Sequence, residues 1–486
     1  MDSSPLDLPS GEAAALLATA AELAVRHSRH VADGPVAPRG PATAAVRDWL
    51  RDYDFAGPRP AQDVLVEVVD QLRTGMVHTI HPRYFGLFNP TPTWWGVAGE
   101  LIAAAVNPQL AVYAHACAPV EIETHVLRFL ASRLGLPDGA TGTFTVGGSE
   151  ANLTAMIVAL TRRWPAYAEG GLGAVAGRPV FYASAECHLA WVKIAHMAGL
   201  GRGAARLVPV DGAHRMDVHR LRAMIDADVA AGHAPFLLVA TAGTTGAGAL
   251  DPLPELAALA RASGLDLHVD AAWGGAVALS DRLRPLLAGI EAADSITVDA
   301  HKWLSAPMGA GMFLTPHADA LGASFGVQTT FMPAGAGGLP DPYSSSVQWS
   351  RRFIGLKVFL ALAAAGRPAF ARQLERDVEL GELLARRLAE HGWLQVNDTP
   401  LPVVCVVDPE ADGRDTEHSL EWHAAVAARV VRGGRAWLSS LVLDGRPALR
   451  MCVTSHRTTA TDIEALVSEL GTCRRELTTE IAGAIR

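Results

Sequence analysis

The chain has 486 residues, 50% of them hydrophobic and 19% charged, which is enough for one large α/β domain with appendages or for several ordinary domains. Fifty acidic residues outnumber 41 basic ones, and the net charge of -9 is spread without a basic block. This balance argues against nucleic acid or an anionic membrane surface as the main partner. Five cysteines lie far apart without C-x-x-C spacing, so we expect no disulfide framework, no metal site and a reducing, cytoplasmic compartment. We expect neither a secretory signal nor a membrane span, because no stretch stays apolar over ~18 residues.

Residues 1–80 are predicted to form helices around a Pro- and Gly-rich connector at 34–45. Within them, residues 62–76 carry apolar side chains at helical spacing. A segment this short cannot bury its apolar face alone. We therefore expect it to pack on the rest of the chain or on a second subunit.

From about residue 140 to 315, short apolar strands alternate with amphipathic helices. The pattern predicts strands at 179–184, 205–210, 236–243, 265–270 and 295–300, and helices at 186–201, 216–232 and 252–264. Such alternation indicates a mainly parallel sheet covered on both faces. Ligands bind at the carboxyl ends of strands in sheets of this kind, so we expect functional residues directly after each strand.

The part of the chain after about residue 366 repeats the α/β pattern on a smaller scale. Two strands, at 435–443 and 448–455, are predicted on either side of a DGRP turn. Thr461 and Glu464 form a capping-box pattern before the last helix. The small-residue stretch 333–342 is predicted to be a mobile loop.

Two strand ends carry hydroxyl and glycine residues. Gly148 and Ser149 open an apolar helix after the strand TFTV, where free backbone N–H groups can hold a phosphate. Thr244 and Thr245 follow the strand at 236–243 and can bond a polar ligand. Either motif is also an ordinary turn, so each is weak evidence alone.

Two other strand ends carry an acid and an amine. Asp270 ends an apolar strand, where a carboxylate is costly to bury unless it is paired. Lys302 follows the next strand and is one of only three lysines in a chain that otherwise uses arginine. A lysine amine can lose its proton in a protein and an arginine cannot, which indicates that the amine itself is needed, although composition bias also allows a chance lysine.

Taken together, a phosphate cradle, a buried aspartate and a nucleophilic lysine in this order on one parallel sheet predict a pyridoxal phosphate site. The lysine would form an imine with the cofactor aldehyde. The aspartate would keep the pyridine nitrogen protonated, so that the ring accepts electrons from the substrate α-carbon.

The motifs HPRYFGLFNP, VGGSEAN, ECH, ATAGTT, HVDAAWGG, DAHKWL and SRRFIGLK, between residues 81 and 357, make the sequence resemble a known family. It is that of the group II pyridoxal-phosphate-dependent amino-acid decarboxylases, which include aromatic-L-amino-acid and glutamate decarboxylases. The resemblance implies a fold-type I, aspartate-aminotransferase-like subunit with a mainly parallel seven-stranded sheet. It also implies an N-terminal dimerisation arm (1–80), a large cofactor-binding domain (81–365), a small C-terminal α/β domain (366–486) and a homodimer with active sites at the interface.

The same resemblance assigns roles to individual residues. Lys302 would be the Schiff-base lysine, Asp270 the partner of the pyridine nitrogen, and His188 and Ala272 the residues on the two faces of the ring. The remaining expected cofactor contacts are Gly148, Ser149, His301 and Thr245. Asp299 stands where family members carry asparagine, which puts an acid close to the expected phosphate.

Substrate and catalytic residues outside the cofactor contacts are also implied. Arg450 resembles a small-domain arginine near the substrate carboxylate, and its alternative is a surface strand arginine. Phe88 and Asn89, in the GLFNP segment, are expected to line the substrate pocket, although the aromatic residues of this region can equally be core. Tyr343 resembles the loop tyrosine that protonates the carbon after CO2 leaves, and its alternative is a plain lid residue.

The predicted activity is decarboxylation of an L-amino acid to the amine, with His188 also restricting rotation of the carboxylate. One alternative is an aldehyde-forming or transaminating enzyme on the same scaffold. Aldehyde-forming members tend to carry phenylalanine at the loop tyrosine position, so Tyr343 favours the amine. A second alternative is a non-catalytic protein that kept the fold, against which Lys302, Asp270 and His188 argue.

Overall fold

The computed structural model describes residues 4, 6–38, 42–327, 329, 339–413 and 415–484. Its centre is a seven-stranded sheet of order β1-β7-β6-β5-β4-β2-β3. Only β7 runs antiparallel to both of its neighbours, while β6, β5, β4, β2 and β3 are mutually parallel, which confirms the predicted mainly parallel sheet. The strands are β1 (Thr141–Thr145), β2 (Arg178–Ser184), β3 (Ala205–Val208), β4 (His233–Thr241), β5 (Asp266–Asp270), β6 (Ser295–Asp299) and β7 (Gly311–Thr315).

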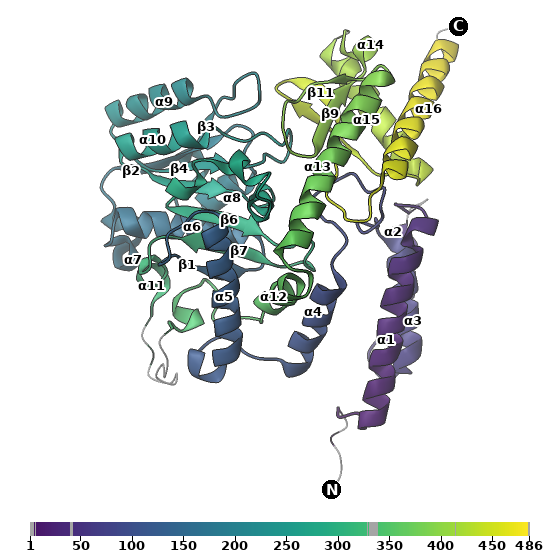
Figure 1. Ribbon diagram of the computed structural model, residues 1–486, viewed down its shortest axis with the longest axis horizontal. Helices are drawn as coiled ribbons and strands as arrows, with labels where there is room; N and C mark the ends of the chain where they lie inside the picture. The colour runs from purple at the N-terminus through teal and green to yellow at the C-terminus, as the bar shows by residue number, and fades with distance from the viewer. Residues whose placement is uncertain are drawn as a thin grey trace.

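Helices cover this sheet and bury both of its faces (Figure 1). In β4, Leu238 and Ala240 belong to one buried cluster, whereas Leu237 and Val239 belong to another. Because successive side chains of a strand point to opposite faces, a strand buried on both faces must be apolar throughout. The first cluster includes α5 (Cys117–Arg133), α9 (Val218–Ala230) and α10 (Leu253–Ser263), and the second includes α6 (Gly148–Arg163), α8 (Ala190–Met197) and α11 (Ala320–Phe325).

A second, antiparallel sheet of order β10-β11-β9-β8 forms the smaller C-terminal layer. Its strands are β8 (Leu394–Gln395), β9 (Val403–Val407), β10 (Ser439–Leu443) and β11 (Arg446–Cys452), so the predicted pair around the DGRP turn is confirmed. It packs on α13 (Arg367–Glu390), α15 (Thr416–Gly433) and α16 (Ala460–Ala484). Two further helices, α7 (Tyr167–Gly170) and α14 (Pro409–Asp412), are single turns.

The N-terminal helices lie outside both sheets. They are α1 (Ser10–His30), α2 (Ala42–Leu50) and α3 (Ala61–Gly75), and Figure 1 shows α1 and α3 side by side, away from the seven-stranded sheet. No residue of α3 is buried in the single chain. The side chain and backbone of Ser28 accept hydrogen bonds from Arg457, which ties α1 to the small sheet's domain. We expected residues 62–76 to need packing against the rest of the chain or a second subunit, and the lack of buried residues in α3 fits that expectation.

Several predicted boundaries were wrong. The capping box of α16 is formed by Thr459 and Asp462, whose Oδ2 accepts from the Thr459 backbone N–H at 3.0 Å and the Thr459 hydroxyl at 2.7 Å, and not by Thr461 and Glu464. The helix predicted from residue 186 begins at Ala190, and α2 begins inside the predicted connector. Residues 333–338 of the predicted loop lie outside the described residues.

Two further helices, α4 (Trp94–Val106) and α12 (Gly355–Ala365), lie against each other. The glycine Gly366, with φ +72°, separates α12 from α13. The division into three domains remains a prediction. No described helix combines the length and the apolar character that crossing a membrane requires.

Candidate active site at the carboxyl ends of the strands

A cavity of about 380 Å³ lies where β1, β4, β5 and β6 end. Eight predicted residues line it together: Gly148, Ser149, His188, Thr245, Asp270, Ala272, His301 and Lys302. They come from positions 148 to 302 of the sequence, and the sheet topology is what brings them to one edge.

Lys302 lies in a tight turn after β6. Its Nζ is 3.2 Å from Oδ2 of Asp299, and its side chain is 24% exposed and lines the cavity. Asp299 itself is buried, and its Oδ1 has no hydrogen-bond partner among the described residues. The amine is therefore accessible and held by one carboxylate.

Asp270 ends β5 and is 6% exposed. Its Oδ2 accepts from Asn152 Nδ2 at 2.7 Å and from Trp191 Nε1 at 3.4 Å, and its Oδ1 accepts from the backbone N–H of Ala272 at 3.2 Å. All three donors are uncharged, so the carboxylate brings an uncompensated negative charge to the cavity wall.

The N-terminus of α6 forms another part of the cavity wall. The N–H groups of Gly148 and Ser149 open the helix, and no hydrogen bond joins them to the described backbone. A Cβ on Gly148 would lie 2.8 Å from Asp299 Oδ2, so the close approach needs glycine. Free N–H groups at the start of a helix suit an anion.

Two histidines face the cavity from different sides. Nδ1 of His301 accepts from the Ala310 backbone at 3.1 Å, which leaves Nε2 as the donor in the neutral ring. Burial lowers the pKa of His301, although Asp299 opposes this. Nδ1 of His188 accepts from the Ala190 backbone N–H at 3.1 Å, so this histidine is tied to the first residue of α8 and also lines the cavity.

The two threonines predicted after β4 have different roles. Thr245 lines the cavity, but the Thr244 hydroxyl accepts from the Ala249 backbone at 3.0 Å and stabilises the turn. Thr241 also lines the cavity, and its buried hydroxyl has no partner among the described residues. Sequence reasoning missed Thr241 because it belongs to the strand rather than to the turn.

The predicted substrate residues Arg450, Phe88 and Asn89 lie outside the cavity lining. Arg450 is buried, donates to the carbonyls of Thr245 at 2.7 Å and Gly86 at 2.6 Å, and lies 5.0 Å above the Phe88 ring. The Phe88 ring stacks at 4.2 Å on Trp273, a residue of the lining. Asn89 Nδ2 contacts Sδ of Met308, also a lining residue, at 3.2 Å. These three are thus one contact away from the cavity.

The alternative interpretation of Arg450, as an arginine on the surface of a strand, was wrong. Only 3% of it is exposed, and its hydrogen bonds to the described residues all go to backbone carbonyls, those of Thr245, Gly246 and Gly86. Its Nη2 is buried without a partner among the described residues. A buried guanidinium with a free N–H suits a carboxylate ligand.

Tyr343 does not reach the cavity of its own chain. Its backbone N–H donates to the Ala111 carbonyl at 3.0 Å, and its ring lies 4.7 Å from that of Trp349. It belongs to a short 3-10 turn, Pro342–Ser344, beside the undescribed residues 330–338.

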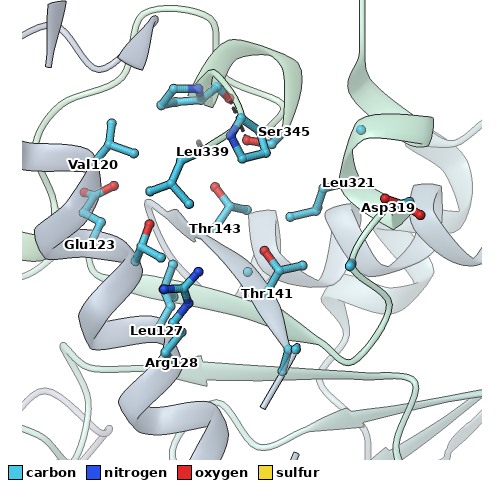
Figure 2. A pocket seen from close by; sticks show the side chains of 18 of the residues that line it. Val120, Glu123, Leu127, Arg128, Thr141, Thr143, Asp319, Leu321, Leu339 and Ser345 are labelled. Carbon is cyan, nitrogen blue, oxygen red and sulfur yellow. Dashed lines mark hydrogen bonds between the residues drawn. The ribbon is translucent and has the colours of Figure 1, made fainter. Parts of the chain in front are cut away.

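A larger cavity, of about 600 Å³, lies beneath this turn, between α5, β1 and α11 (Figure 2). Figure 2 shows Glu123, Arg128, Thr141 and Thr143 around it. None of the described residues that line it belongs to the predicted site, so size does not identify the active site here.

Besides Thr241, sequence reasoning missed Asn152 and Trp273. Asn152 lies on the first turns of α6, four positions after Gly148, where its side chain points at Asp270. Nothing in the local sequence shows that contact, because the partners are 118 positions apart. The signal available was the position of Asn152 in the VGGSEAN motif.

The donor set fits pyridoxal phosphate. An accessible amine, an uncompensated carboxylate and a helix N-terminus lie around one cavity, and the Thr241 hydroxyl, which has no partner among the described residues, adds a further polar group. The amine suits the aldehyde of the coenzyme, and the carboxylate suits its protonated ring nitrogen. The helix N-terminus suits its phosphate.

Comparison with known proteins agrees with this arrangement. Residues 53–406 match the pyridoxal-dependent decarboxylase conserved domain. The chain is 26% identical to the aromatic-L-amino-acid decarboxylase of Bacillus atrophaeus, over 97% of both chains. It is 31% identical to human cysteine sulfinic acid decarboxylase, over 87% of this chain and 88% of the relative. The crystal structure of Oryza sativa TDC with PLP and tryptamine covers 98% of this chain and 100% of its own, with a TM-score of 0.92 at 24% identity. The chain therefore belongs to the pyridoxal-dependent decarboxylase family, and it is a pyridoxal-phosphate-dependent amino-acid decarboxylase.

Proposed function

We propose that Lys302 is the residue that holds pyridoxal phosphate covalently and that Asp270 pairs with the ring nitrogen. The observation that carries this is their presence in one cavity with the free N-terminus of α6. When bound, the coenzyme supplies an electron sink for the pair of electrons released as CO2 departs.

The remaining lining residues orient the coenzyme in this proposal. Gly148, Ser149 and His301 hold the phosphate of the coenzyme. Thr245 bonds the polar edge of the coenzyme next to that phosphate. His188 and Ala272 lie against the two faces of the ring. His188 also limits rotation of the substrate carboxylate, because its ring is fixed by the hydrogen bond from Ala190.

Arg450 is proposed to bind the carboxylate of the substrate through its unpartnered Nη2. Phe88 positions that guanidinium by cation–π contact and Asn89 borders the pocket near Met308. The named relatives act on aromatic amino acids in one case and on cysteine sulfinic acid in another. A screen of the common amino acids, diamino acids and sulfinic acids for CO2 release would identify the substrate.

Tyr343 is proposed to protonate the α-carbon and so to direct the reaction to the amine. Assaying CO2, amine, ammonia and peroxide together tests this point. Amine equal to CO2, without peroxide, is expected. Ammonia and peroxide equal to CO2 would show the aldehyde-forming reaction instead.

We also propose a homodimer located in the cytoplasm. The dimer is supported by α3, none of whose residues is buried in the single chain, and by exposed apolar residues along α4: Trp94, Trp95, Leu101, Ile102 and Val106. The location rests on the five cysteines, which are all unpaired.

The decisive experiment is to reduce the purified protein with borohydride and map the coenzyme by mass spectrometry. We expect the coenzyme on Lys302 and on neither Lys193 nor Lys357. A Lys302→Ala variant should lose the visible absorbance band, and a Lys193→Ala variant should keep it. Attachment to another residue would refute the proposed site.

A further inference from the structure

Behind the Asp270 carboxylate lies a row of buried polar side chains that the proposed chemistry does not use. Asn152, on α6, contacts Asp270 through Nδ2 and His268 Nε2 through Oδ1, at 2.7 and 3.2 Å. Nδ1 of His268 lies 2.8 Å from the Ser295 hydroxyl. Each of the four side chains is at most 6% exposed.

The direction of these hydrogen bonds follows from the carboxylate. An ionised carboxylate only accepts, so the NH2 of Asn152 must face Asp270 and its carbonyl oxygen must face His268. That oxygen needs a donor, so the proton of the imidazole lies on Nε2. Nδ1 is then the acceptor for the Ser295 hydroxyl. One tautomer of His268 satisfies every bond in the row.

The register of the sheet fixes this row. β5 and β6 are parallel, with His268 opposite Ser295 and Asp270 opposite Thr297. Residues two apart on a strand share a face, so His268 and Asp270 both point toward α6. The Thr297 hydroxyl adds a weaker contact to His268 Nε2 at 3.4 Å, and the Trp191 ring packs against the imidazole at 5.3 Å.

The three side chains behind Asp270, those of Asn152, His268 and Ser295, are uncharged. Burial lowers the pKa of His268 to about 4, although the nearby Asp270 opposes the shift. A charged imidazolium here would compensate the carboxylate and weaken its hold on a protonated ring nitrogen. The neutral ring can orient Asn152 without that cost.

We propose that His268 is a positioning residue for the coenzyme: as the Nε2–H tautomer, anchored by Ser295, it fixes the Asn152 amide and so aims the free edge of the Asp270 carboxylate at the ring nitrogen. This inference rests on the proposed pairing of Asp270 with that nitrogen.

Two substitutions of His268 separate this role from packing. Glutamine can place its amide NH2 near the position of Nε2 and so can still donate to Asn152. Asparagine places its NH2 near Nδ1 and cannot. Asn152→Leu keeps a side chain of similar shape but removes the hydrogen bonds of residue 152 to both Asp270 and His268.

The measurement is the affinity of the cofactor-free protein for two probes, followed by tryptophan fluorescence. One probe is pyridoxal phosphate, and the other is its analogue with C–H in place of the ring nitrogen. The ratio of the two affinities reports the contact with Asp270 and is independent of turnover. Thermal unfolding of each cofactor-free variant shows whether it folds.

The wild type should prefer pyridoxal phosphate. His268→Asn and Asn152→Leu should each reduce that preference about tenfold, the size of one hydrogen bond to a charged group, while His268→Gln keeps most of it. Equal losses for both probes, or equal behaviour of the asparagine and glutamine variants, would overturn the relay. A wild type that binds both probes equally would instead contradict the pairing of Asp270 with the ring nitrogen, and the relay with it.

Discussion

At the start of α6, two adjacent glycines differ in what a side chain would meet. A Cβ on Gly148 would lie 2.8 Å from Asp299 Oδ2, which is inside contact distance. A Cβ on Gly147 would meet only His301 Cε1 at 3.5 Å, and its φ of 166° is extended backbone. Glycine is therefore needed at 148 because of the carboxylate that holds Lys302, and this makes residue 148 part of the site's geometry.

Gly148→Ala should weaken the affinity for pyridoxal phosphate about tenfold or more, because the added methyl displaces Asp299 and narrows the cradle. Gly147→Ala is the matched control and should change the affinity only about twofold, since its contact is ordinary. Titration of the cofactor-free proteins measures both. Equal losses in the two variants would show that crowding at Asp299 is not the cause.

At the scale of elements, the strands and their ends were predictable and the contacts between elements were not. Asp270 and Lys302 could be placed because an apolar strand buried on both faces is visible in the sequence, and the sheet brings such strand ends together. The cap of α16 was misplaced because Thr459 and Thr461 both fit the local pattern, and the structure selects the pair Thr459 and Asp462. The relay from Asn152 to His268 depends on contacts over more than a hundred positions, which no local pattern shows.

A buried contact joins the turn of Lys302 to α13. Trp303 Nε1 donates to Oδ2 of Asp377 at 2.8 Å, and Gln373 Nε2 donates to its Oδ1 at 2.8 Å. Asp377 is fully buried, and burial raises its pKa to about 7. The folded protein thus holds the proton of Asp377 more tightly than the unfolded chain, so this group lowers stability as the pH rises from about 4 to about 7, and no further above that.

Asp377→Asn should remove this pH dependence while keeping an acceptor for Trp303. The free energy of unfolding of the variant relative to wild type should rise by roughly 1 kcal/mol for each pH unit up to about pH 7 and then level off. Urea unfolding at pH 5, 6, 7 and 8 measures the difference. A difference that is constant over this range would mean that Asp377 is ionised in the folded protein throughout.

At the scale of the whole molecule, a single chain leaves large apolar side chains uncovered along α4. Leu101 is 48% exposed, Ile102 is 52% exposed and Val106 is 68% exposed. An apolar helix face of this kind normally marks an interface. Together with α3, it defines the surface that we propose to be covered by a second copy of the chain.

The double variant Leu101→Glu, Ile102→Glu should weaken the dimer at least about thirtyfold, because it places charges in the proposed interface. Val229→Glu on α9 is the control, since Val229 is 59% exposed and lies on a different helix. Sedimentation velocity over a range of concentrations measures the association. A double variant that associates as tightly as the control would exclude α4 from the interface.

The proposed role of Tyr343 would link the proposed dimer to the chemistry. It does not line the cavity of its own chain, and its segment is held by the Ala111 carbonyl, so a role as proton donor requires it to act on the cavity of a second subunit. Mixing subunits tests this directly. In a dimer of one Lys302→Ala subunit and one Tyr343→Phe subunit, donation across the interface leaves one site with both an intact lysine and an intact tyrosine, whereas donation within a chain leaves none.

Amine formation should therefore reappear when the two variants, each inactive alone in this assay, are unfolded and refolded together. With random pairing, half the dimers are mixed and one of their two sites is complete, so the yield should approach about a quarter of the wild-type rate. Refolding each variant separately and then combining them is the control, and it should give no recovery if subunits do not exchange. No amine after joint refolding, with mixed dimers present by native mass spectrometry, would place Tyr343 outside the partner's active site.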